Sequence, residues 1–350
     1  MYNLGFQATI KGKNIMNKLT KLSILSLFST VTFYAQAGTL SNVQAKDSLS
    51  CGVSTGLVGF SSTDSKGRWK GLDVDVCRAV AAATLGDANK VKFVPLTAKE
   101  RFTALQSDEI DLLSRNTTWT LTRDASLGFN FAGVNYYDGQ GFMVKKSLGV
   151  TSAKDLNGAT FCLQAGTTTE LSLADYFRSN NMQYSTIPSD TAAQSKNGFE
   201  LGRCDVLTSD QSQLYALRTT LKDPSSAVIL PDVISKEPLG PVVRQGDDNW
   251  FNIVRWSLNA MITAEELGVT SKNIQGTFKN PEIKRLLGRH GKMNEYLGLD
   301  KKWAYNIISQ VGNYSESFER NIGEDTPLNI SRGLNALWAD GGILYSPPFR

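Results

Sequence analysis

The sequence predicts an α/β protein with two lobes, between which the chain crosses twice. Strands and helices alternate from residue 49 to residue 114, an order typical of a parallel sheet with right-handed crossovers. A second alternating pattern starts at residue 141. The segments near 139–142 and 237–241 border this second block, so we expect the chain to pass there from one lobe to the other.

The first lobe is expected to begin with a short buried strand. The segment 54–71, rich in glycine and serine, predicts a loop or hairpin. Val74, Cys77 and Ala81 then recur at helical spacing, and Gly86 is a suitable residue for that helix to stop at. The elements expected here are, in order, a strand at 49–53, a helix at 71–87, a strand at 91–95, a helix at 98–107 and a strand at 110–114.

The second lobe is expected to repeat this alternation with short apolar strands. Its main helix is predicted at 167–179. A segment near 236–243, with Pro238 and Pro241, then leads to a helical stretch at 247–267, and the remaining tail is mostly helical. The other elements expected are strands at 141–145, 159–164, 185–188, 204–208 and 227–230, and a short helix or turn at 153–158.

Residues 1–37 predict an N-terminal extension and a signal peptide. From Met16 the chain reads MNKLTK, then LSILSLFSTVTFY, then AQA, which is a basic region, an apolar region and a cleavage signal. We expect cleavage after Ala37 and an exported, soluble protein. The apolar run is shorter than the about 20 residues that a membrane span needs. Residues 1–15 indicate either a long basic region or a true start at Met16, which we favour.

The charge distribution excludes some classes of function. Four lysines and no acidic residue lie in 1–37, so the remaining chain has 33 basic and 33 acidic residues. A neutral body argues against nucleic-acid binding driven by phosphate neutralisation. His290 is the one histidine of the sequence. Sites that need a pair of histidines, and His-based catalytic triads, are therefore disfavoured.

Four cysteines in an exported protein suggest disulfide bonds. They are Cys51, Cys77, Cys162 and Cys204. We expect Cys51 to pair with Cys77 and Cys162 with Cys204, because each pair then falls within one predicted lobe. Free buried thiols are the alternative. The wide spacing of the four argues against a metal cluster.

Three polar loops directly follow predicted strands, at 114–124, 165–171 and 208–212. Ligands of parallel sheets bind at the carboxyl ends of the strands. The first loop is rich in arginine, asparagine and threonine. In the second, Thr167 and Glu170 fit a capping box at a helix start, where free N–H groups favour an anion.

These loops together predict a site for a dipolar solute. Arg123 can grip a carboxylate with two parallel hydrogen bonds, and Asp210 can bind an ammonium group. Together they match an α-amino acid. Taken singly, each residue has a structural explanation: Arg123 as a solvated charge or a partner of Asp124, the capping box as a simple cap, and Asp210 as a turn former. Only the combination of the three loops favours a binding site.

Five segments of the sequence carry a resemblance to a known family. It resembles the periplasmic substrate-binding proteins of amino-acid ABC transporters, and closely the general L-amino-acid-binding branch. The segments are GLDVDVCRAVAAA (71–83), LLSRNTTWTLTRD (112–124), YYDGQGFMV (136–144), CLQAGTTTELSLADYFR (162–178) and GRCDVLTSDQS (202–212).

The resemblance covers nearly the whole chain after residue 37 and implies a type II periplasmic binding fold of solute-binding protein family 3. Residues 38–140 and 241–350 would form the first lobe, and residues 141–240 the second. The lobes would close around the ligand by a hinge motion. The protein would then deliver the ligand to the membrane permease of an ABC transporter.

The resemblance also implies roles for residues in all three polar loops. Arg123 stands where the family binds the ligand carboxylate, and Asp210 where it binds the ammonium. Thr118 and Asn116 match ligand contacts in the first loop. Thr168 matches a residue whose backbone N–H and hydroxyl meet the carboxylate.

Three further residues complete the expected ligand-binding set. Thr167 lies beside Thr168 in the second turn. Phe60 lies near the family's aromatic that packs on the ligand. Arg115 stands where the commonest family pattern has a small polar residue. Arg115 could reach an acidic or amide side chain of the ligand, or line the rim of the cleft.

Three classes of function compete. A binding protein needs no proton shuttle, and we expect this class: no enzyme, no cofactor, no metal, no nucleic acid, and a monomer that meets an L-amino acid and permease subunits in the periplasm. An enzyme on the same fold, such as a dehydratase, would need a tuned acid or base, for which Asp210 is the candidate. A sensor domain would normally be joined to a membrane span.

Overall fold

The computed structural model describes residues 38–350. The expected start at Met16, the signal peptide and the cleavage after Ala37 therefore lie outside the described residues. Within 38–350, no helix combines the length and the apolar character that crossing a membrane requires.

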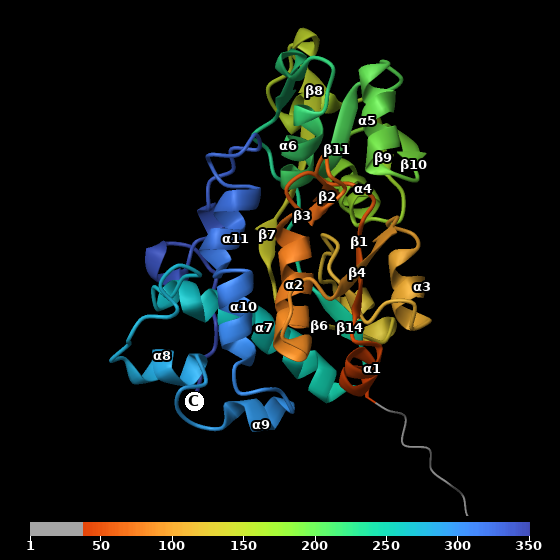
Figure 1. The fold of residues 1–350 in the computed structure, drawn as a ribbon. Coiled ribbons are helices and arrows are strands. Elements are labelled where there is room, and N and C mark those ends of the chain that lie inside the picture. The colour runs from red at the N-terminus through yellow and green to blue at the C-terminus, as the bar shows by residue number, and fades with distance from the viewer. Residues whose placement is uncertain (1–37) are drawn as a thin grey trace, which may run out of the picture. The chain divides into compact units, whose positions relative to one another are not determined.

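The first of two five-stranded sheets has the strand order β4-β1-β5-β14-β6 (Figure 1). The strands β4 and β5 both run parallel to β1, as predicted. The strand β14 follows the second crossing in the chain and runs antiparallel to β5 and β6. The strands are β1 (Leu49–Ser54), β4 (Val91–Leu96), β5 (Leu112–Leu113), β6 (Phe129–Phe131) and β14 (Val242–Arg244).

Helix α2 (Leu72–Leu85) covers this sheet and ends where the sequence predicts. Gly86 has a φ of 74°, the left-handed conformation that stops a helix without steric cost. Gly71 begins the helix with a φ of 135°, and a Cβ at this position would overlap the Phe60 carbonyl. The segment 54–71 before it holds the short hairpin of β2 (Ser62–Thr63) and β3 (Trp69–Lys70).

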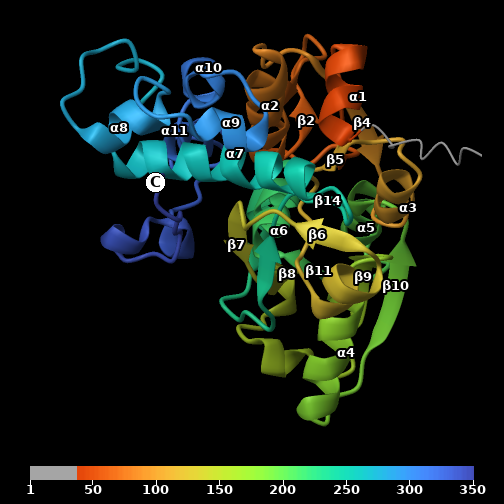
Figure 2. The same ribbon diagram turned by 90° about the horizontal axis from the view of Figure 1, so that it is seen from below.

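The long helix α7 (Asp248–Glu266) supports the first sheet from below. Figure 2 shows it as a long helix that crosses α2, and it packs against α2, α10 and α11. Its buried side includes Trp250, whose indole N–H donates to the Asp111 carbonyl at 2.8 Å. The other helices of this part are α1 (Thr39–Lys46), α3 (Arg101–Gln106), α8 (Pro281–Leu286), α9 (Met293–Leu297), α10 (Trp303–Gln310) and α11 (Tyr314–Asn321).

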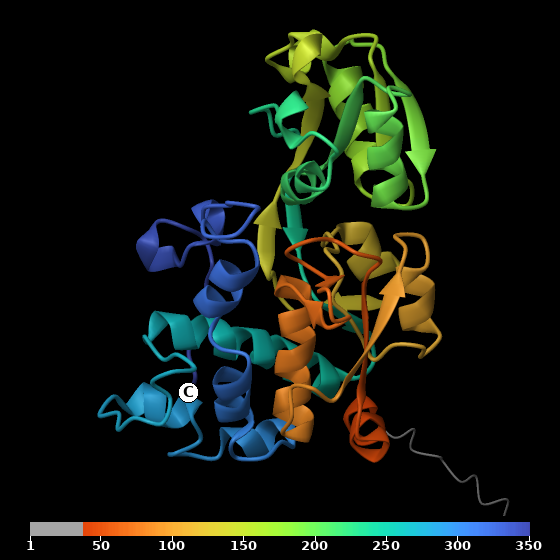
Figure 3. The ribbon, with the colours of Figure 1, turned by 45° about the horizontal axis from the view of Figure 1, so that its top comes forward.

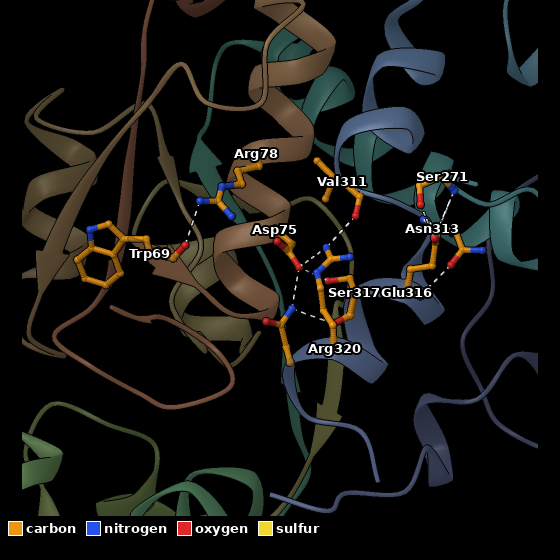
Figure 4. A network of polar contacts seen from close by, with 10 residues as sticks. Trp69, Asp75, Arg78, Ser271, Val311, Asn313, Glu316, Ser317 and Arg320 are labelled. Carbon is orange, nitrogen blue, oxygen red and sulfur yellow. Dashed lines mark hydrogen bonds and ion pairs between the residues drawn. The ribbon is translucent and has the colours of Figure 1, made fainter. Parts of the chain in front are cut away.

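A buried carboxylate joins α2 to α11 (Figure 4). Asp75 accepts hydrogen bonds from Ser317 at 2.6 Å, from Arg320 at 2.6 Å and from Asn321 at 2.7 Å. Asn313 and Glu316 form a capping box at the start of α11. Asp75 lies in the first turn of α2, so these bonds fix the start of α2 to α11.

The second sheet has the order β10-β9-β11-β8-β12. The strands β9, β10 and β11 are parallel, whereas β8 is antiparallel to both β11 and β12. Helix α5 was not predicted, because its sequence AAQSKNGFE has few apolar residues. The elements are β8 (Gln140–Lys145), β9 (Thr160–Gln164), α4 (Thr169–Ser179), β10 (Ser185–Ser189), α5 (Ala192–Glu200), β11 (Val206–Asp210), α6 (Gln211–Thr219) and β12 (Ala227–Ile229).

A two-stranded ribbon connects the two sheets (Figure 3). Its strands are β7 (Tyr136–Asp138) and β13 (Glu237–Leu239), which run antiparallel with Glu237 opposite Asp138. The strand β13 overlaps the crossing predicted near 237–241, whereas β7 ends just before the crossing predicted near 139–142. The amide side chain of Asn335, from the C-terminal tail, hydrogen-bonds both the N–H and the carbonyl of Tyr137, at 2.7 Å and 3.1 Å.

Both expected disulfides are present. Cys51 of β1 is bonded to Cys77 of α2, with Cα atoms 6.1 Å apart. Cys162 of β9 is bonded to Cys204, just before β11, with Cα atoms 5.7 Å apart. Each bond lies within one sheet and its helices, so neither restricts a relative movement of the two sheets.

Candidate functional site

A closed pocket lies where the loops after β5 and β9 meet the end of β11 and the start of α6. The third predicted loop, 208–212, is therefore not a loop, because α6 follows β11 directly. The pocket's volume is about 10 Å³, about the room that one water molecule needs. Six of the eight expected ligand-binding residues line it, together with five that were not expected. The lining residues are Arg101, Arg115, Asn116, Thr118, Gln164, Thr167, Thr168, Thr169, Ser209, Asp210 and Gln213.

The first loop is held by a buried carboxylate from α2. Asp73 accepts a hydrogen bond from the backbone N–H of Asn116 at 2.7 Å and from the side chain of Asn135 at 3.0 Å. Asn116 has a φ of 27°, an unusual backbone conformation that this bond helps to maintain. Burial raises the pKa of Asp73, and these hydrogen bonds oppose the rise.

The same loop is also tied to the ribbon. Trp119 donates its backbone N–H to the Pro238 carbonyl at 2.8 Å, and Gly240 donates to the Thr117 carbonyl at 3.1 Å. Thr118 forms a single antiparallel bridge with Leu239. Backbone hydrogen bonds therefore attach the first loop to β13 and the residue that follows it.

Two buried arginines supply positive charge to the pocket. Arg115 donates from Nε to the Leu96 carbonyl at 2.9 Å, and burial lowers its pKa to about 10. Arg101 is 2% exposed and donates to the Thr117 hydroxyl at 3.4 Å and to the Gly166 carbonyl at 3.3 Å. Its Nε has no hydrogen-bond partner among residues 38–350. Burial also lowers the pKa of Arg101.

Sequence reasoning did not identify Arg101, because its position inside a predicted helix does not reveal that its side chain is buried beside the pocket. A signal was present: Arg101 is the first residue of the helix that follows β4. It therefore lies near the same carboxyl edge of the sheet as the predicted loops.

Arg123, near the end of the first loop, is not among the described residues that line the pocket. It donates to the Thr118 carbonyl at 2.8 Å, and its guanidinium lies 5.2 Å from the ring centroid of Phe102. With 8% exposure it is not a solvated surface charge. Burial lowers its pKa, while the carboxylates of Glu237 and Asp210 oppose that shift.

The predicted capping box of Thr167 and Glu170 is wrong. The Thr167 hydroxyl donates to the Gln164 carbonyl at 2.8 Å, and Glu170 accepts from the Gly166 N–H at 3.2 Å. Helix α4 begins at Thr169, with Thr168 as its N-cap residue. The two side chains instead close the turn that precedes the helix. The first residues of α4 still line the pocket, where the helix N-terminus favours negative charge.

Asp210 is the last residue of β11, directly before α6, and it lines the pocket. It is 7% exposed, and its pKa is raised well above the ordinary value by burial and by the neighbouring carboxylates of Asp138 and Glu237. Arg101 and a hydrogen bond with Asn116 oppose this shift. Burial likewise raises the pKa of Asp138 to about 6. Asp210 is therefore a carboxylate that lacks a full cationic partner.

Glu237, on β13, is a second residue that sequence reasoning missed. It is 2% exposed and lies behind two of the lining threonines. Its Oε2 accepts from the hydroxyls of Thr118 at 2.6 Å and Thr168 at 2.8 Å. The available signal was an acidic residue inside the proline-containing crossing segment.

Phe60 is not part of this pocket. It is 1% exposed in the core of the first sheet and packs edge-on against Tyr136, with ring centroids 5.3 Å apart. Its backbone carbonyl instead accepts hydrogen bonds from the N–H groups of Asp73 and Val74 at the start of α2. Loop 54–71 turns the side chain inward, an orientation that the loop sequence does not reveal.

Direct contacts join the two halves of the pocket. Asn116 donates to the Gln213 side chain at 3.1 Å, and Lys99 forms an ion pair with Asp190 at 2.8 Å. The pocket thus combines arginines and a helix N-terminus with one buried, underpartnered carboxylate. Such an arrangement is complementary to a small solute that carries both a cation and an anion.

A sequence model of one family matches this chain. The family is described as bacterial extracellular solute-binding proteins, family 3, and the match spans residues 49–276.

Individual proteins are similar over nearly the full length. The general L-amino acid-binding periplasmic protein AapJ of Rhizobium johnstonii is 56% identical, over 95% of this chain and 99% of its own. The glutamate/glutamine/aspartate/asparagine-binding protein BztA of Rhodobacter capsulatus is 52% identical, over 96% of this chain and 100% of its own. A solved structure, an ABC transporter periplasmic binding protein from Brucella ovis with glutathione bound, is 56% identical with a TM-score of 0.88, over 90% of this chain and 100% of that one.

Proposed function

The chain belongs to the bacterial extracellular solute-binding proteins of family 3, and we propose that it binds L-amino acids in the periplasm and delivers them to an ABC transporter permease. The observation that carries the proposal is the placement of Asp210 in one pocket with two arginines and the start of α4. The printed functions of AapJ and BztA also support it.

In the proposed complex, Asp210 binds the α-ammonium group of the ligand. An ammonium supplies the positive partner that this buried carboxylate lacks. It favours the ionised form of Asp210 and so opposes the rise in its pKa that burial causes. The α-carboxylate binds at the N-terminal turn of α4 and to Arg123, which exchanges its bond to the Thr118 carbonyl for the ligand.

Arg101 and Arg115 face the ligand's side chain in this arrangement. Both are buried, and the Nε of Arg101 lacks a hydrogen-bond partner among the described residues. A side-chain carboxylate or amide of the ligand would accept from these donors. We therefore propose broad amino-acid binding with a preference for acidic and amide side chains.

We propose that residues 38–140 with 241–350 and residues 141–240 act as two lobes that open and close about the ribbon of β7 and β13. A pocket of about 10 Å³ supports this, because an amino acid can enter it only if the lobes separate. Each disulfide lies within one of the proposed lobes, which is compatible with such a movement.

Residues 16–37 act as a signal peptide that is removed after Ala37, and the exported protein is a monomer that meets the permease. It binds its ligand unchanged and is no enzyme. The pocket's arrangement of opposite charges supports recognition of a stable dipolar solute in its ground state.

Thermal shift and titration calorimetry on the purified protein test this function. The ligands are the twenty L-amino acids, their D-forms and des-amino carboxylates. A ligand that binds only the folded state increases the free energy of unfolding, by about 2.7 kcal/mol when the free ligand is at a hundred times its Kd. The unfolding midpoint rises accordingly. We expect shifts with several L-amino acids, largest for acidic and amide ones. Binding of des-amino carboxylates alone would contradict the proposal.

Glutathione is a second candidate ligand because of the Brucella ovis structure. Its γ-glutamyl end carries a free α-ammonium and α-carboxylate, so it presents the same dipolar group as an amino acid. Including glutathione in the same titrations separates a peptide carrier from an amino-acid carrier. The ligand with the lower Kd identifies the principal solute.

A further inference from the structure

One buried carboxylate touches both sides of the pocket from behind. Glu237 accepts hydrogen bonds from Thr118, on the first loop, and from Thr168, at the start of α4. Its other oxygen accepts from the Ser235 hydroxyl at 2.6 Å. Glu237 is 2% exposed, while both threonines line the pocket.

These bonds determine which polar atoms the threonines can present to a ligand. A hydroxyl has one hydrogen to donate and two lone pairs that accept, whereas an ionised carboxylate only accepts. The bonds to Glu237, at 2.6 Å and 2.8 Å, are shorter than the 3.4 Å contact between the two hydroxyl oxygens. Both hydroxyl hydrogens are therefore committed to Glu237, since bonds to a charged acceptor are the stronger ones.

We propose that Glu237 is a positioning residue that sets the polarity of the pocket through Thr118 and Thr168. With their hydrogens committed, both hydroxyls turn lone pairs towards the ligand. The two hydroxyl oxygens can then accept hydrogen bonds from the ligand's α-ammonium group, but they cannot donate to its carboxylate. This inference rests on the proposed binding of amino acids and names the residue that selects them over des-amino acids.

The inference changes one expected role. The sequence resemblance implies that the Thr168 hydroxyl meets the ligand carboxylate, but a hydroxyl that already donates to Glu237 has no hydrogen left for it. The backbone N–H groups at the start of α4 and the arginines remain as the donors to the carboxylate. Thr168 then contributes its oxygen to the ammonium, beside Asp210.

The geometry also ties this polarity to lobe closure. Thr118 belongs to the loop that is hydrogen-bonded to β13, so it stays beside Glu237. Thr168 lies at the start of α4 in the second sheet's part of the chain. Its bond to Glu237 requires α4 to approach the ribbon, so the second ammonium acceptor is oriented only in the closed arrangement.

The test compares L-glutamate with glutarate, which differs from it by the absence of the α-amino group. Titration calorimetry gives the ratio of the two affinities for the wild-type protein and for three variants. Glu237→Met removes both acceptor bonds and frees the hydroxyl hydrogens. Glu237→Gln keeps a carbonyl oxygen that can still accept from both threonines. Ser235→Ala removes the bond on the other carboxylate oxygen and the bond that the Ser235 hydroxyl accepts from the Gln140 N–H. It leaves both threonine bonds to Glu237 in place, and it is the matched control.

We expect Glu237→Met to lower the glutamate-to-glutarate affinity ratio at least tenfold. Glu237→Gln and Ser235→Ala should stay within threefold of the wild-type ratio. If Glu237→Met weakens both ligands equally, Glu237 has only a structural role and the inference is overturned. If the wild-type protein does not bind L-glutamate at all, the proposed function itself fails.

A second variant keeps the test decisive if Glu237→Met does not fold. Thr168→Val removes one of the two oriented hydroxyl oxygens and leaves Glu237 in place. The inference requires it to lower the same affinity ratio at least threefold. An unchanged ratio, or a selective loss of glutarate binding, would show that the Thr168 hydroxyl does not accept from the ammonium.

Discussion

Replacing Asp210 by asparagine should weaken amino-acid binding while leaving the unliganded protein at least as stable. Asp210 is 7% exposed, so an ammonium bound beside it is removed from water. Leaving such a charge without its partner costs about 2–5 kcal/mol, which corresponds to an increase in Kd of about 30-fold to 5,000-fold.

The effect on stability has the opposite sign. Burial, Asp138 and Glu237 raise the pKa of Asp210 well above its unfolded value of 3.8. The folded state thus binds the proton more tightly than the unfolded state, and Asp210 lowers stability as pH rises above 3.8. Asparagine removes this cost, so the unfolding midpoint of the unliganded variant at pH 7 should equal or exceed that of the wild type.

The assay pairs titration calorimetry with thermal unfolding, on the same samples with and without L-glutamate. Asp205→Asn is the matched control, because Asp205 is an exposed aspartate just before the same strand, at its other end. It should leave both affinity and midpoint unchanged. Wild-type affinity in Asp210→Asn would refute the role of Asp210 as the ammonium partner. A lower midpoint at pH 7 would refute the reasoning about its buried charge.

Amino-acid binding should release protons, because an ammonium favours the ionised forms of Asp210 and of Asp138, whose pKa is about 6. Affinity should therefore fall below about pH 6, and calorimetry in buffers of different ionisation enthalpy counts the protons. Arg101→Met should weaken L-glutamate at least tenfold more than L-alanine; equal losses would exclude a side-chain role. Asp73→Ala should lower the free energy of unfolding by about 2–3 kcal/mol in urea titrations, because it leaves loop donors unpaired. Replacing both Cys162 and Cys204 by alanine should cost about 2–4 kcal/mol by the same method, since their disulfide closes a separation of 42 residues; an unchanged midpoint would mean that the bond adds no stability.

Local patterns predicted most of the secondary structure. The spacing of Val74, Cys77 and Ala81 identified α2, and Gly86 marked its end, because both signals depend on neighbours within one or two turns. Helix α5 escaped prediction because its apolar face is short. The antiparallel placement of β14 was also missed, since it brings together strands that lie more than a hundred residues apart in the sequence.

The candidate site also contains residues that the sequence predicted and residues that it did not. Thr118 and Thr168 follow strands and Asp210 ends one, and the rule that ligands bind at the carboxyl edge of a parallel sheet was enough to group them. Phe60 was misplaced because the direction of its side chain depends on how a loop of eighteen residues folds back on α2. Arg101 and Glu237 were overlooked because one stands on a helix and the other on a crossing strand.

The sequence by itself determined the α/β class, the two alternating blocks, the disulfide partners and the three polar segments at strand ends. Each of these follows from residue type and short-range spacing, which the chain carries before it folds. Only the tertiary structure decided that Glu237 reaches Thr118, 119 positions away, and takes up its hydroxyl hydrogen. The direction of a hydrogen bond depends on which groups meet in a buried space, and that meeting exists only after the two sheets and the ribbon have packed.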